Sequence, residues 1–131
     1  EALVLKREIY TRWVATLGVS DERTILSGSN AAASMIGLRL DDEAKSLVRD
    51  QLLPAARTIL GVNHHLTLRL NEHLATALAC DPKRTRVDLL EAETIMQDVA
   101  QRRRRVFGPM HPSTSEADNN LSYLRARLAR A

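Results

Sequence analysis

The stretch that decides the fold is a glycine-containing segment that occurs three times along the chain. Its third copy reads Phe107-Gly108-Pro109-Met110-His111-Pro112-Ser113-Thr114. The earlier copies read Leu17-Gly18-Val19-Ser20-Asp21-Glu22-Arg23-Thr24 and Leu60-Gly61-Val62-Asn63-His64-His65-Leu66-Thr67. The glycines are 43 and 47 residues apart, and a threonine follows each of them by six positions. Self-similarity at such a period indicates a repeat protein, in which one supersecondary unit stacks on the next.

Each copy has the properties of a tight joint between two helices. A glycine after an apolar residue is a common helix end, because glycine adopts a left-handed conformation without steric cost. In the third copy His111 and Pro112 suit the start of the next helix, where proline loses no needed hydrogen bond. So short a linker makes neighbouring helices antiparallel. We expect His64 and His111 to cap helices; a metal cluster is not expected, since His64, His65 and His73 lack the i, i+4 spacing on one helix.

Apolar residues recur with helical spacing between the joints. After the third joint Ala117, Leu121, Leu124 and Leu128 fall on one face of a helix. We expect an all-α single domain over residues 1–131, with joints near 18–24, 61–67 and 108–114. The six predicted helices cover about 2–17, 24–38, 42–60, 66–79, 87–107 and 113–130. The chain starts at Glu1 inside the first of these, so we expect it to be a piece of a longer array.

Two irregularities interrupt the repeat. Pro54 falls inside the third predicted helix and should kink or split it near Leu53, because proline cannot donate the helical hydrogen bond. The stretch 79–85 is longer than the equivalent turn 37–41, which accounts for the spacing of 47 residues against 43. We expect it to be an exposed loop with Asp81-Pro82 as its turn.

The third joint resembles the tetratricopeptide repeats of kinesin light chains and their relatives. Those repeats carry Leu-Gly-Pro-x-His-Pro-x-Thr, followed by Asn-Asn-Leu-Ala. In this chain Asn119-Asn120-Leu121 follows the third joint. The second joint region keeps Gly61, His64, Thr67, Leu74 and Ala75, and the first keeps Leu17, Gly18, Thr24 and Asn30. The resemblance covers most of the chain and is closest after residue 60.

The resemblance implies a right-handed α-α superhelix of antiparallel hairpins, a solenoid of the tetratricopeptide kind. In such arrays the first helix of each hairpin lines a concave groove that binds peptides or partner proteins. Groove asparagines of these relatives hold the backbone of an extended peptide, and His73 replaces one of them here. The resemblance therefore implies a candidate groove made of Asn30, Arg69, Asn71, His73, Asn119 and Asn120.

The net charge of +3 is unevenly distributed along the chain. Residues 1–65 hold eight basic and eight acidic side chains, whereas residues 66–131 hold eleven and eight. The densest run, Arg102, Arg103, Arg104 and Arg105, is a candidate basic surface for an acidic partner. Four consecutive helical residues point around most of the circumference, however, so we expect mainly a solvated face and no nucleic-acid site.

The remaining residues favour no catalytic chemistry. The single cysteine, Cys80, excludes an intrachain disulfide and a cysteine-rich zinc site. No Ser-His-Asp, paired-carboxylate or phosphate-cradling pattern is present, so neither an enzyme nor a cofactor is predicted. Tyr10 and Trp13 are interpreted as packing residues. No segment has the length of a membrane span and no signal peptide is evident, so we expect an intracellular, cytoplasmic protein, with an organelle still open.

The sequence is compatible with three functions. The first is a protein- or peptide-binding scaffold, because stacked hairpins build an extended surface. The second is a structural segment permanently docked in a larger assembly, because open ends of such an array expose apolar surface. The third is a basic module that binds an acidic partner through the excess of charge after residue 66.

Overall fold

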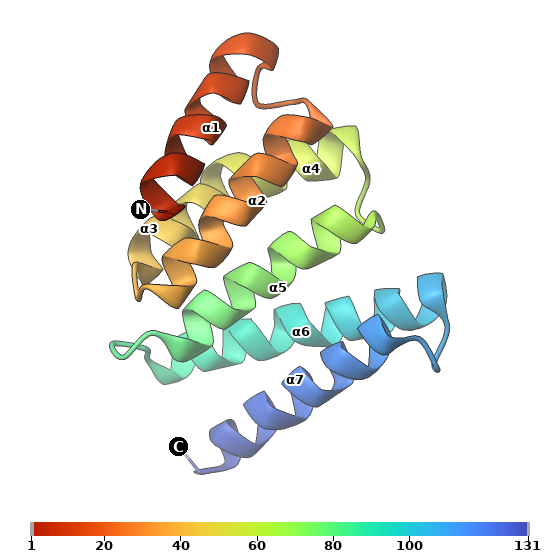
Figure 1. Cartoon of the computed structure of the whole chain (residues 1–131). Coiled ribbons are helices and arrows are strands. Elements are labelled where there is room, and N and C mark those ends of the chain that lie inside the picture. Colours follow the sequence, from red (N-terminus) through yellow and green to blue (C-terminus); the bar gives the residue numbers. More distant parts are fainter. Residues whose placement is uncertain (1, 131) are drawn as a thin grey trace.

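The computed structural model describes residues 2–130, and all regular structure in this range is helical (Figure 1). Three elements, α3, η1 and α4, follow one another without a break. The described residues therefore form six continuous helical segments, whose ends match those of the six predicted helices to within two residues. The elements in order are α1 (Ala2–Leu17), α2 (Glu22–Gly37), α3 (Asp41–Ser46), the π-helical turn η1 (Leu47–Leu52), α4 (Leu53–Ile59), α5 (His65–Cys80), α6 (Arg86–Phe107) and α7 (Pro112–Arg130).

The three joints share one backbone geometry. Gly18, Gly61 and Gly108 have φ of 80°, 91° and 91°, a region that L side chains rarely adopt. Three residues after each glycine, a side chain accepts a hydrogen bond from the backbone N–H two positions further on. These caps are Asp21 to Arg23 at 2.9 Å, His64 to Leu66 at 3.1 Å and His111 to Ser113 at 3.0 Å. The predicted capping role of the two histidines is confirmed.

The recurrent threonine has a packing role. Thr24, Thr67 and Thr114 are completely buried at the start of α2, α5 and α7. Each hydroxyl donates a hydrogen bond back across the joint, and each bond ties the start of one helix to the end of the helix before it. The acceptors are the carbonyl oxygens of Trp13 at 3.4 Å, Ala56 at 3.5 Å and Gly108 at 2.8 Å.

The turn η1 absorbs one extra residue. A Glu-Ala pair precedes each joint glycine, and the segment from this pair to the glycine is one residue longer in 43–61 than in 1–18 and 91–108. A single inserted residue is commonly accommodated as a π-helical turn. The wider turn also lies just ahead of Pro54, whose ring would meet the carbonyl four residues back in a regular α-helix. The segment is therefore divided at Leu53, as predicted, by a change of helical pitch without a break.

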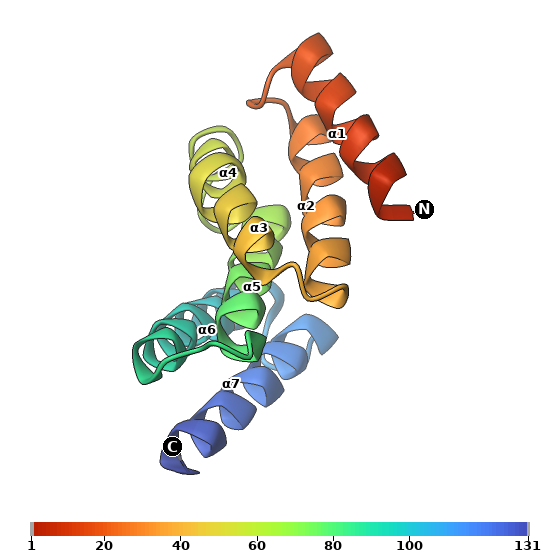
Figure 2. The same cartoon turned by 90° about the vertical axis from the view of Figure 1, so that its left-hand side faces the viewer.

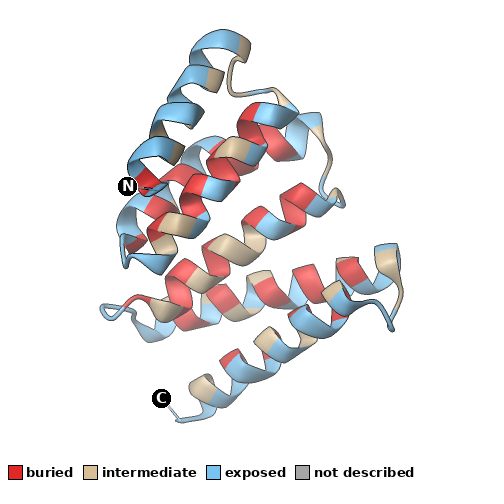
Figure 3. Ribbon diagram, viewed as in Figure 1, coloured by how far each residue is buried: buried red, intermediate tan, exposed pale blue. Residues whose placement is uncertain are grey.

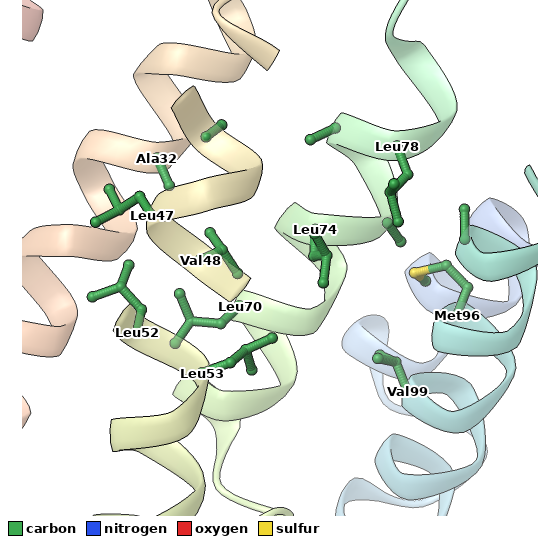
Figure 4. Packing of buried hydrophobic residues seen from close by; sticks show 14 of the residues in the cluster. Ala32, Leu47, Val48, Leu52, Leu53, Leu70, Leu74, Leu78, Met96 and Val99 are labelled. Atoms are coloured by element: carbon green, nitrogen blue, oxygen red, sulfur yellow. The ribbon is translucent and has the colours of Figure 1, made fainter. Parts of the chain in front are cut away.

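Consecutive helices run antiparallel and pack into hairpins (Figures 1 and 2). Figure 2 shows α3, α4 and α6 on the same side of α2 and α5. One apolar core continues from α1 to α7 along the inner faces of the helices (Figure 3). Leu52, Leu70 and Met96 belong to it (Figure 4). Many of its members are alanines, which let helices approach closely.

Polar contacts between successive hairpins recur at nearly the same spacing as the joints. Tyr10 on α1 donates to Gln51 on η1, 41 residues later, at 2.9 Å. Arg49 pairs with Glu91 on α6, 42 residues later, at 2.5 Å. Lys83, in the loop after α5, pairs with Asp42 at 2.9 Å, also 41 residues away. One of these contacts recurs: Arg49 binds the glutamate of the Glu-Ala pair on α6, and Arg7 on α1 binds the glutamate of the Glu-Ala pair on α3 in the same way.

Candidate functional site

The accessible face of the first helices carries residues of matching register. Asn30 on α2, His73 on α5 and Asn120 on α7 stand at the same offset from the joint glycine that precedes each of them. We call these three residues, together with those one helical turn before and after them, the first-helix row. All of its members are exposed or half-buried. The flanking members are Leu26 and Ala33 on α2, Arg69 and Thr76 on α5, and Glu116 and Tyr123 on α7.

A buried polar cluster supports the row between α5, α6 and α7. Arg103 on α6 forms an ion pair with Glu72 on α5, with 3.1 Å between Nη2 and Oε1. The side chains of Arg103 and Glu72 are only 7% and 13% exposed. Asn120 donates its amide to Glu72 at 2.9 Å, and Arg103 also donates to the carbonyl of Ser113 at 3.3 Å. Three helices are thereby joined beneath one member of the row.

His73 lies beside this cluster in a half-buried position. Burial lowers the pKa of its imidazole, and the positive charges of Arg69 and Arg103 lower it further, while the carboxylate of Glu72 acts in the opposite direction. The pKa of His73 therefore falls below that of a free histidine. The row presents a neutral imidazole that can both donate and accept a hydrogen bond.

Two hollows adjoin the row. One, of about 150 Å³, lies between α5, α6 and α7, and its lining includes Asn120 and Cys80 together with Ala75, Met96 and Leu124. The other, of about 280 Å³, lies between α1 and α2 and includes Asn30. Each hollow thus combines apolar side chains with an amide of the row. Such a combination suits an apolar side chain next to a hydrogen-bonded backbone.

The structure brings together four of the six predicted groove residues. Asn30, His73, Asn120 and Arg69 belong to the first-helix row, while Asn71 and Asn119 do not. Two residues from His73 along the helix correspond to about 200° of rotation. Asn71 accordingly points away from the row and donates to the carbonyl of Thr67 at 3.1 Å.

Asn119 stands at a different register. The residues at the equivalent offset from a joint glycine are Ser29 on α2 and Glu72 on α5. Ser29 is buried and Glu72 faces the cluster, so this register points toward the following helix and not toward the row. Asn119 is exposed on α7 at a different register from Asn120, so its groove role stays a prediction.

The candidate basic surface needs a correction at Arg103. This side chain is buried against Glu72, because it occupies the inner face of α6. Arg102 pairs with Asp98 at 2.9 Å and Arg104 with Asp118 at 2.8 Å. Arg105 is exposed on yet another side of the helix. The four arginines point around the helix as expected and form no continuous patch.

The structural roles of Glu72 and of the buried Arg103 were not predicted from the sequence. One signal for Glu72 was present, since it is the single acidic residue in 65–80, a stretch otherwise dominated by apolar side chains. A lone carboxylate in such a stretch requires a partner when it is buried. The identity of that partner depends on the packing of α6, which the periodicity does not specify.

Between Ala2 and Arg130, no three histidine, cysteine or acidic side chains are placed to hold a metal ion. Within the same range, no helix combines the length and the apolar character needed to cross a membrane. The site therefore consists of hydrogen-bonding and apolar side chains on three helices. Neither a known protein-family model nor a curated protein matches this chain.

Proposed function

We propose that this chain is a tetratricopeptide-like array, a right-handed superhelix of helical hairpins, that acts as a non-catalytic scaffold and binds an extended peptide along the first-helix row. The proposal is supported by the positive φ of the glycine at all three joints and by an ion pair that recurs, Arg7 with Glu43 between α1 and α3 and Arg49 with Glu91 between η1 and α6. Repeated contacts of this kind favour a continuous stack and an extended binding surface.

The matching register of Asn30, His73 and Asn120 is the observation that carries the proposal. An extended peptide presents backbone donors and acceptors at regular intervals. Side-chain amides and a neutral imidazole both donate and accept, so they match such a backbone without selecting its sequence. The hollows beside Asn30 and Asn120 supply apolar contacts for alternate side chains.

Asn120 has a second role that limits its freedom. One N–H of its Nδ2 group already donates to Glu72, so its carbonyl oxygen and one N–H are left for a ligand. Asn30 is exposed and keeps its whole amide for a partner. We therefore expect Asn30 and His73 to contribute more to binding than Asn120.

A random peptide library displayed on phage and selected on the full chain tests this function. We expect enriched peptides whose binding weakens about tenfold in Asn30→Ala and in His73→Ala, since a lost hydrogen bond in a binding site costs roughly 1–1.5 kcal/mol. Arg57→Ala, at an exposed position on α4, is the matched control and should bind normally. A selection without enrichment, or peptides indifferent to both row substitutions, would contradict the proposal.

A second candidate function is a structural segment permanently docked in a larger assembly. The apolar side chains exposed on α1, Val4, Leu5 and Ile9, favour it. Sedimentation of the isolated chain separates the two functions. A stable monomer over a wide concentration range supports the peptide-binding scaffold, whereas self-association or precipitation supports obligatory docking.

A further inference from the structure

The inner face of α1 is firmly attached to the rest of the molecule. Leu3 is buried, and Tyr10 packs against the core. Lys6 donates to Ser34 on α2 at 2.7 Å, and Arg7 pairs with Glu43 on α3 at 2.6 Å. The orientation of α1, and hence of its outer face, is fixed by these contacts.

The outer face of α1 is apolar and hollowed. Leu5 and Ile9 are 57% and 39% exposed. Together with Ala2 they line the hollow of about 280 Å³ that α1 forms with Ser27 and Asn30 of α2. A second hollow, lined also by Arg12 and Thr16, continues along the helix past Ile9 to Trp13. We call Ala2, Leu5, Ile9 and Trp13 the α1 face.

The α1 face consists of core positions that lack their cover. Aligning the Glu-Ala pairs, and allowing for the extra residue in η1, places Ala2, Leu5 and Ile9 level with two other sets of three residues. Those sets are fully or largely buried, because α2 and α5 pack over them. They are Ala44, Leu47 and Leu52 on α3 and η1 and Ala92, Ile95 and Val99 on α6.

The helices that cover the equivalent faces share one pattern. A large apolar, a small and a large apolar residue recur at i, i+7 and i+10, as Ile25, Ala32 and Met35 on α2 and as Leu68, Ala75 and Leu78 on α5. All six are at most 4% exposed. On α7 the same positions hold Ser115, Ser122 and Arg125, which are exposed.

The two ends of the molecule therefore differ in chemistry. On α7 the outward face is polar and exposed. On α1 the outward face is apolar and hollow. We propose that the α1 face is a docking site for one amphipathic helix of a protein partner, with a large apolar, a small and a large apolar residue at i, i+7 and i+10.

This occupant follows from continuity with the two interfaces inside the molecule, where helices of that pattern already cover equivalent faces. A second copy of the chain does not fit in a head-to-tail arrangement, because its α7 offers Ser115, Ser122 and Arg125. The inference names the partner chemistry for the second candidate function. It does not require peptide binding at His73 or Asn120, although the α1 face and the first-helix row share the hollow beside Asn30.

The first experiment uses the α5 segment 64–80 as a synthetic peptide, with Cys80→Ser to prevent oxidation, and the full chain as its receptor. Trp13 is the only tryptophan of the chain and belongs to the α1 face, so its emission reports docking directly. We expect a saturable blue shift. The matched peptide with Leu68→Ser, Ala75→Ser and Leu78→Arg carries the residues of α7 and should cause none.

Variants of the receptor locate the contact. Leu5→Ser with Ile9→Ser should weaken binding by about tenfold or more, since two apolar side chains lose their burial. Leu90→Ser removes an equally exposed leucine of α6 and should leave binding unchanged. His73→Ala should also leave it unchanged, which separates this site from the peptide-binding row.

A short helical peptide is marginally stable in water, so a covalent version supplements the first experiment. A copy of residues 64–90 placed ahead of Glu1 continues the Glu91-Ala92 register into Glu1-Ala2. We expect a higher urea midpoint and a blue-shifted Trp13 emission, neither of which should occur with the three α7-type substitutions. Equal results for both fusions would overturn the proposal, as would dimerisation of the unextended chain that Leu5→Ser with Ile9→Ser abolishes.

Discussion

Two hairpins of this molecule, α2 with α3–α4 and α5 with α6, have the same pair of buried positions and fill them with opposite chemistry. The first position of the pair lies equally many residues after a joint glycine in both hairpins. The second position lies equally many residues before the following joint glycine in both hairpins. In the first hairpin they hold Ser29 and Ala56, and in the second they hold Glu72 and Arg103. All four are buried or nearly so.

The comparison shows that the hairpin geometry does not depend on one kind of contact. Ser29 is small, and its buried hydroxyl has no hydrogen-bond partner among the described residues. Glu72 and Arg103 instead form a desolvated ion pair that also binds Asn120 and Ser113. The hairpin that contains Ser29 is left with apolar contacts at this position. In the other hairpin the charged pair of Glu72 and Arg103 links α5, α6 and α7.

Breaking the ion pair should have the largest effect on stability. Glu72→Ser or Arg103→Ala leaves one buried charge without its partner, which typically costs about 3–5 kcal/mol. Urea unfolding of each variant measures the loss. Arg49→Ala breaks an exposed pair with Glu91 and should cost less than about 1 kcal/mol.

The double variant Glu72→Ser with Arg103→Ala copies the first hairpin into the second. Because it removes both charges, it should lose less than the sum of the two single losses by about 1–3 kcal/mol. Additive losses would mean that the pair contributes no coupling. The two hairpins would then differ at these positions only in the size of their side chains.

Side-chain volume should have the next largest effect, chiefly in the first hairpin. Leu52 is completely buried and contacts the region of Gly28, where an added Cβ would lie 2.5 Å from Leu52 Cδ2. Leu52→Ala should cost about 2–5 kcal/mol, and Gly28→Ala alone about 1–3 kcal/mol by overpacking. Thermal or urea unfolding gives both values.

The same two substitutions combined should partly compensate, because the new methyl group of residue 28 enters the space left by Leu52. In the second hairpin Asn71 and Val99 occupy these registers. Val99→Ala removes fewer atoms than Leu52→Ala and should cost less. An equal cost in both hairpins would contradict the role assigned to the Gly28–Leu52 contact.

The joints should respond alike in both hairpins, with a smaller effect. No atom lies within 4 Å of a Cβ added to Gly61 or Gly108, so only the positive φ opposes alanine. Gly61→Ala and Gly108→Ala should each cost about 1–3 kcal/mol. Gly37 ends α2 without a positive φ and is the matched control, for which alanine should be neutral or stabilising by about 0.4–1 kcal/mol.

The joints and helix bounds could be predicted because their causes are local. A positive φ requires glycine, a cap requires a side-chain acceptor, and both leave a mark at a fixed position such as Gly108 or His111. The four accessible row residues were also predictable, since register alone determines which face of a helix a residue occupies.

The buried cluster could not be predicted in the same way. Arg103 belongs to a run of four arginines in the sequence, and its burial depends on which side of α6 meets α5. The pitch change in η1 likewise results from one extra residue. This residue becomes visible only when the sequences of α1, α3–α4 and α6 are compared with each other. These features depend on packing between distant segments, and periodicity within one helix does not contain that information.

The smallest predicted effect concerns His73, which replaces the asparagine found at the same register on α2 and α7. Its pKa is lowered in the folded chain, mainly by burial, so the folded state favours the neutral imidazole. Below the ordinary histidine pKa of about 6.5, the unfolded chain therefore binds the proton more readily, and stability should fall as the pH drops from 7 toward 5. His73→Asn, which gives α5 the residue found at this register on α2 and α7, should flatten this dependence, measured by urea midpoints across that range. An equal flattening in His65→Asn, at an exposed position, would show that the loss does not arise at the row.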